Sequence, residues 1–151
     1  MKLKLSAATV LLAVMLPLAA HADMPGAHPS YVHALTDLRD ARWNLEHRPG
    51  DIAVSTQESI AISEIDRAIG EVARAAREDD KNPQYRPHED AGLDRPGRLH
   101  HAVDLLLQAR DDLAMEEDNQ EARELKRRAL DHVNGALEAA RHAIHDVERN
   151  R

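Results

Sequence analysis

The chain has 151 residues, a formal charge of −7, no cysteine, no phenylalanine and very few aromatic residues. The absence of cysteine excludes disulfides, thiol redox chemistry, thiolate metal sites, lipoprotein acylation and covalent haem attachment. Nucleic acid and anionic lipid repel an acidic chain, so neither is expected as a partner. The length suits a single domain, whose core must be aliphatic.

The first 22 residues have the pattern of an export signal. Lys2 and Lys4 give a basic start, residues 7–18 are mostly apolar, and Ala20-His21-Ala22 is an A-x-A cleavage site. The apolar run is shorter than the roughly 20 residues of a membrane-spanning helix; an uncleaved anchor is the alternative. We expect residues 1–22 to be a cleaved signal peptide, no membrane span after cleavage, and a periplasmic or secreted protein. Cleavage removes two lysines and no acid, which shifts the formal charge from −7 to −9.

Apolar residues recur at helical spacing in the first half of the mature chain. Ser30 is a plausible N-cap for a first helix that should stop at residues 47–50, because His47-Arg48-Pro49-Gly50 contains a proline and a glycine. Ser55-Thr56-Gln57-Glu58 has capping-box spacing and should start a second helix, which runs to about residue 78.

The second half has the same organisation. Residues 81–97 carry three prolines and two glycines without any period and are predicted to be a linker. A third helix is expected over about 98–116 and a fourth from Asp118, its likely cap, to the C-terminus. Four amphipathic segments and no strand pattern predict an all-α, antiparallel four-helix bundle over residues 23–151, with up-down-up-down order.

The two halves resemble each other at an offset of 68 residues. His33-Ala34 returns as His101-Ala102, and Ala41-Arg42 returns as Ala109-Arg110. The register predicts that Leu38 is equivalent to Leu106 and Ile69 to Leu137. We therefore expect two repeated helical hairpins, at residues 30–80 and 98–151, related by a pseudo-two-fold axis.

A motif in the first helix is similar to one found in a group of small exported helical proteins. It consists of His28-Pro29, Tyr31, His33-Ala34-Leu35, Asp37-Leu38-Arg39, Ala41-Arg42 and His47-Arg48-Pro49-Gly50, with looser echoes at Gly97-Arg98-Leu99-His100 and Ala109-Arg110-Asp111-Asp112. In these residues the chain resembles proteobacterial helical-bundle proteins of unknown function. The resemblance implies export and a helical fold, and it implies no mechanism.

Ten histidines suggest a metal or haem site. At 100° per residue, however, His33, His101 and His142 project opposite the apolar stripes, and the flanks hold His100, His132 and His145. In bundle cofactor proteins the ligands point inward from facing helices, so haem and a di-iron centre are not expected. The best metal candidate is a cluster on the fourth helix, formed by Glu138, His142, His145 and Asp146. Imidazole and carboxylate at i, i+4, i+8 spacing can hold Zn or Cu weakly at a surface. The alternative is that these are solvated acid–histidine pairs.

Three large side chains lie at the margins of the apolar stripes. Arg42 and Arg110 occupy equivalent edges, where an arginine more often covers core residues and pairs with a carboxylate than binds a ligand. Trp43 could anchor an interface or be a half-buried rim residue.

No constellation in the sequence points to an enzyme. A glycine-rich phosphate loop, a nucleophile in a recognisable setting and paired inward carboxylates are all missing. The sequence therefore favours a non-enzymatic exported bundle that acts in binding, scaffolding or envelope stress, as a monomer or homodimer with an unknown protein partner. The alternative function is low-affinity Zn or Cu binding.

The mature protein is predicted to begin at Asp23. Intact-mass measurement on exported material checks this prediction, and a species that retained residues 1–22 would show an uncleaved anchor instead.

Overall fold

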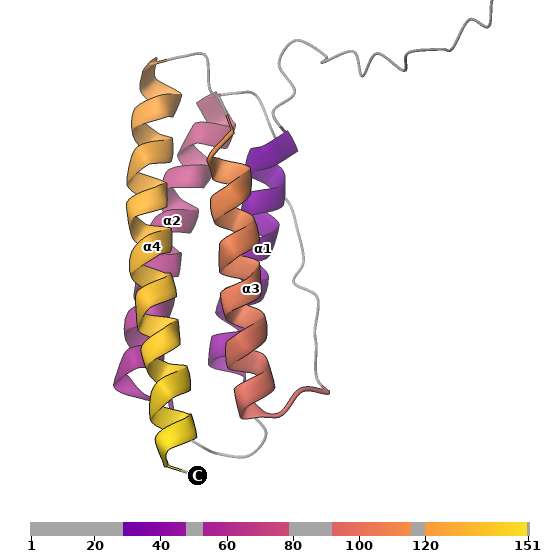
Figure 1. Ribbon diagram of the computed structural model, residues 1–151. Coiled ribbons are helices and arrows are strands. Elements are labelled where there is room, and N and C mark those ends of the chain that lie inside the picture. The colour runs from indigo at the N-terminus through magenta and orange to yellow at the C-terminus, as the bar shows by residue number, and fades with distance from the viewer. Residues whose placement is uncertain (1–28, 48–52, 79–91, 116–119, 151) are drawn as a thin grey trace, which may run out of the picture.

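The computed structural model describes residues 29–47, 53–78, 92–115 and 120–150. These ranges contain four helices and no strand: α1 (Pro29–Glu46), α2 (Thr56–Glu78), α3 (Arg95–Leu113) and α4 (Gln120–Arg149). The helices pack side by side, which confirms the predicted all-α four-helix bundle (Figure 1). None of the helices in these ranges is both long enough and apolar enough to span a membrane. The predicted signal peptide lies outside the described residues.

The order of the helices around the bundle differs from the predicted up-down-up-down arrangement. Both α1 and α4 pack against α2 and α3, so α2 and α3 are diagonal rather than neighbouring. Figure 1 shows that all neighbours are antiparallel, whereas α2 and α3 run in the same direction. The prediction was wrong because it assumed that consecutive helices pack together. The end of α2 and the start of α3 instead lie at opposite ends of the bundle (Figure 1).

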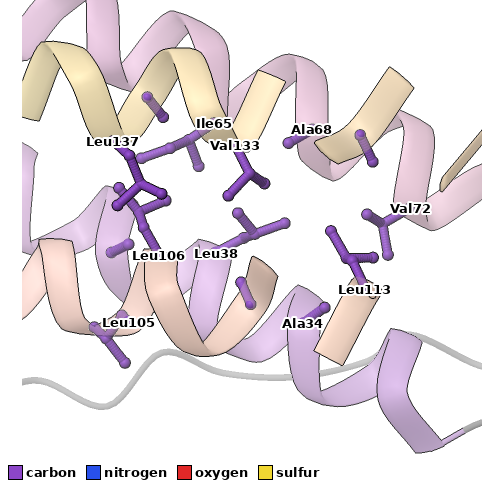
Figure 2. Close-up of a cluster of buried hydrophobic side chains, with 14 of the residues drawn as sticks. Ala34, Leu38, Ile65, Ala68, Val72, Leu105, Leu106, Leu113, Val133 and Leu137 are labelled. Atoms are coloured by element: carbon purple, nitrogen blue, oxygen red, sulfur yellow. The ribbon is translucent and has the colours of Figure 1, made fainter. Parts of the chain in front are cut away.

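The internal repeat is visible in the burial of equivalent positions. Leu38 and Leu106 are both fully buried and lie within the same cluster (Figure 2). Leu137 is buried, and its equivalent Ile69 is half-buried against the same core. Because α1 and α3 are antiparallel neighbours, the predicted pseudo-two-fold axis is one that runs across the bundle rather than along it.

Buried alanines recur at seven-residue spacing in all four helices. All of them are at most 1% exposed: Ala34 and Ala41 on α1, Ala61, Ala68 and Ala75 on α2, Ala102 and Ala109 on α3, and Ala129, Ala136 and Ala143 on α4. A seven-residue spacing keeps a position on the side of the helix that faces a neighbour. A methyl side chain there lets the backbones approach closely, and at Gly135 an added Cβ would lie 3.4 Å from Cγ of Glu64 on α2.

Larger side chains with the same spacing fill the space between the alanines. On α1 and α3 they are fully buried at Tyr31, Leu38, Leu45, Leu99, Leu106 and Leu113. Figure 2 shows side chains of this kind meeting between the four helices. Apart from Tyr31 the described core is aliphatic, as the composition predicted.

The start of α2 is tied to the start of α3. The Glu58 N–H donates to Ser55 Oγ at 3.2 Å and the Ser55 N–H donates to Glu58 Oε2 at 2.7 Å, which confirms the predicted capping box. The Glu58 carboxylate, which is buried, also accepts a hydrogen bond from Arg95 Nη2 at 3.1 Å. The pair therefore fixes both parallel helices at one end of the bundle.

Two predicted helix starts need correction. Ser30 is not an N-cap, because α1 already begins at Pro29, and proline is accepted in the first turn of a helix. The third helix begins at Arg95 rather than Arg98, since Asp94 is the N-cap and accepts a 2.9 Å hydrogen bond from the Gly97 N–H. The predicted cap Asp118 lies outside the described residues.

Truncating Leu106 to alanine is expected to lower the free energy of unfolding by about 2–5 kcal/mol, because a fully buried leucine leaves a cavity in a close-packed core. Denaturant unfolding of Leu106→Ala beside Met115→Ala measures this. Met115 is exposed, so its truncation should cost no more than about 0.5 kcal/mol. Equal losses in both variants would contradict the assigned core.

Candidate functional site

A groove of about 710 Å³ runs between α3 and α4. One residue of α3 and a stripe along the outer side of α4 line it: Arg110, Asn134, Leu137, Glu138, Arg141, His142, His145 and Arg149. Leu137 is buried, while the polar α4 side chains are exposed. The groove therefore has an apolar floor and charged walls that solvent can reach.

Three of the four predicted metal ligands line this groove, and the fourth does not. Asp146 borders a different hollow, where the end of α4 meets the starts of α2 and α3. His142 Nε2 lies 3.9 Å from Glu138 Oε1, and His145 Nδ1 is 2.5 Å from Arg149 Nη2. In the described ranges no three His, Asp or Glu side chains come together as a metal site. Glu138 and His142 are thus the one pair of the predicted cluster that is placed to share a ligand.

The groove also contains three arginines, of which sequence reasoning had singled out one. Arg110 Nη2 lies 3.3 Å from Asp111 Oδ1, and Arg149 Nη2 lies 3.9 Å from Asp146 Oδ1. Both pairs are exposed, and such pairs contribute little to stability. Arg141 makes no ion pair with any residue that the structure describes. Arg149 Nη2 also lies 2.5 Å from His145 Nδ1, so Arg110 and Arg141 are the guanidinium groups most available to an added ligand.

Arg42 has the structural role that the sequence favoured. Its Nε donates to Asp66 Oδ1 at 2.6 Å, and its Nη1 pairs with Glu46 Oε2. Burial lowers the pKa of Arg42, but the hydrogen bond and charge of Asp66, together with Glu46, outweigh that effect and raise it. Arg42 is therefore an internal clamp between α1 and α2.

Trp43 is half-buried and belongs to a small stack at one end of α1. Its ring lies 4.4 Å from the ring of His47, and the Arg98 guanidinium lies 5.1 Å from the centre of the indole. Arg98 is buried, and its Nε donates to the Leu93 carbonyl at 2.9 Å. The contact is a cation–π interaction that ties α1 to the start of α3. This supports the rim alternative for Trp43.

A second hollow, of about 410 Å³, lies between α1 and α3 and is acidic. Burial, followed by repulsion from Asp112 and Asp40, raises the pKa of Asp37 to about 6, although His33 opposes the shift. Burial also raises the pKa of Asp112. This carboxylate pair could not be predicted from the sequence, because its two members meet only when α1 and α3 pack antiparallel.

The chain matches no known protein family, no curated protein and no solved structure. Its function must therefore be argued from its own geometry.

Replacing Asp37 with asparagine should change how stability depends on pH. A folded-state pKa near 6, raised from 3.8, means that the folded protein holds this proton more tightly than the unfolded chain does. The resulting stabilisation is complete below pH 3.8 and is lost as the pH rises through 6. Asp37→Asn should therefore gain stability relative to the parent between about pH 4 and pH 7.

Thermal unfolding of both proteins over this range measures the difference, and a carbon NMR titration of the Asp37 carboxyl measures its midpoint directly. A midpoint near the ordinary value for aspartate, with a pH-independent difference in melting temperature, would contradict the assignment.

Proposed function

We propose that the protein is an exported, non-enzymatic binding protein and that the α3–α4 groove is its binding surface. The observation that supports this proposal is the set of arginines that lines the groove. Arg110, Arg141 and Arg149 line a hollow of about 710 Å³ with no strong internal ion pair among the described residues. Such groups remain free to recognise a ligand.

A catalytic role has less support. A general acid, base or nucleophile requires a partner within hydrogen-bond reach that sets its protonation state. In the groove, His142 lies 3.9 Å from Glu138, and the partner of His145 is a guanidinium. Among the described residues, neither histidine has a carboxylate within hydrogen-bond distance, which favours binding over chemistry.

Metal binding is the second candidate, and the Glu138–His142 pair favours it. A zinc or copper ion on that pair would have two protein ligands and open positions. Binding would be weak, and it would be lost as His142 is protonated.

NMR spectra of the mature protein, titrated with pools of uncharged, cationic and anionic fragments, test the main proposal. Saturable shifts should concentrate on amides of the groove, such as those of Arg110, Leu137 and Arg141. Shifts scattered over the surface, or confined to α1 and α2, would contradict the proposal.

The same spectra titrated with Zn²⁺ separate the second candidate. Saturable binding at neutral pH that disappears in His142→Ala would support a metal site. No saturable shift, or binding that survives His142→Ala together with His145→Ala, would exclude the site as described.

A further inference from the structure

Each hairpin has an arginine at the equivalent position, and the two arginines have different electrostatic surroundings. Arg42 and Arg110 are equivalent in the 68-residue repeat, and their side chains are 35% and 39% exposed. The two arginines are therefore buried to nearly the same extent, and they differ in the carboxylates that surround them.

Both carboxylates that neutralise Arg42 are missing around Arg110. The residue equivalent to Asp66 is Asn134, and the residue equivalent to Glu46 is Ala114. Asn134 lines the α3–α4 groove beside Arg110. The second hairpin therefore keeps the clamp arginine and replaces its two counter-ions with an amide and a methyl group.

Arg110 has one carboxylate contact among the described residues, to its sequence neighbour Asp111 at 3.3 Å, and the Asp111 side chain is 74% exposed. An exposed pair of this kind is strongly screened by water and salt. It is a weak substitute for the two carboxylates around Arg42. Within the part of the chain that the structure describes, Arg110 therefore lacks a close internal counter-ion of the kind that Asp66 provides for Arg42.

The rest of the groove adds positive charge instead of replacing the lost acids. Position 73 in the first hairpin is alanine, and its equivalent in the second is Arg141. The lining contains three arginines and one acid, Glu138, in a chain whose formal charge is −7. Positive charge is thus concentrated where the acidic average of the chain would not place it.

We propose that this groove binds a small ligand with two or more oxyanion groups, either phosphate or carboxylate, and that Arg110 and Arg141 are its principal contacts. The inference rests on the proposed function and specifies its ligand class. A guanidinium presents parallel N–H donors that fit both kinds of oxyanion. Arg110 on α3 and Arg141 on α4 line the groove from different helices, so separate anionic groups of one ligand can engage separate arginines.

Isothermal titration calorimetry of the mature protein with inorganic phosphate, tripolyphosphate and citrate tests the inference. Tripolyphosphate or citrate should bind the parent more tightly than phosphate, with affinity that falls as NaCl is added. The key variant is Asn134→Asp, which restores the carboxylate found in the first hairpin with almost no change in shape. It should weaken binding by at least about tenfold, because Arg110 then has an internal counter-ion.

Matched variants control for charge and for the arginine itself. Gln120→Glu adds the same charge in the first turn of α4, outside the groove, and should change affinity less than about twofold, since exposed charges so far apart are screened. Arg110→Gln should weaken binding as Asn134→Asp does. Arg42→Gln, in the neutralised hairpin, should leave binding unchanged.

If tripolyphosphate binds more tightly than citrate, the oxyanion groups of the ligand are phosphates. If citrate binds more tightly, they are carboxylates. Equal effects of Asn134→Asp and Gln120→Glu would overturn the inference, because binding would then follow net charge rather than this site. If none of the three anions binds while uncharged fragments still shift the groove amides, the anion inference fails and the proposed function stands. If no probe shifts those amides, both fail.

Discussion

Close approach of antiparallel helices through alanine is the constraint on which this structure depends. Each helix carries buried alanines seven residues apart, and larger aliphatic side chains occupy the alternate layers. A chain without phenylalanine can fill its core in this way only if the backbones lie near one another, because small side chains leave voids at larger separations. The same spacing appears in both hairpins, so one packing rule builds all four interfaces.

This packing constrains the buried residues of each helix pair, but it does not constrain the side chains along the solvent-facing margin, or edge, of each interface. On the α1–α2 edge, Asp66 and Glu46 neutralise Arg42. On the equivalent α3–α4 edge, Asn134 and Ala114 stand in place of these two acids, and the arginines line a groove. The α1–α3 edge gathers carboxylates instead, and burial raises the pKa of Asp37 there to about 6. A repeated core thus supports two edges of opposite charge, and function is expected at the edges rather than in the core.

The helices, the aliphatic core and the repeat could be predicted because periodicity and capping are local properties of the sequence. The order of the helices could not, since it depends on which alanine faces meet, and a long segment between α2 and α3 permits more than one answer. Helix starts at Pro29 and Arg95 were missed because proline is accepted in a first turn.

The candidate site was predicted in part. Glu138, His142 and His145 were correctly placed together on one side of α4, but their neighbours were not foreseen. Arg141 and Arg149 gain meaning only beside Arg110 on another helix, which is tertiary information. Alignment of the two repeats does show that Asn134 stands where the first repeat has Asp66. Nothing in the sequence shows that Asp37 and Asp112 lie close together.

The two equivalent arginines, Arg42 and Arg110, differ in their internal counter-ions. Hydrogen exchange of the arginine Nε–Hε groups, measured by NMR in the ligand-free mature protein, detects this difference. Arg42 Nε donates to Asp66 and should exchange slowly, whereas Arg110 Nε should exchange at the rate of a solvated guanidinium. Equal protection of the two groups would contradict the difference in counter-ions between Arg42 and Arg110.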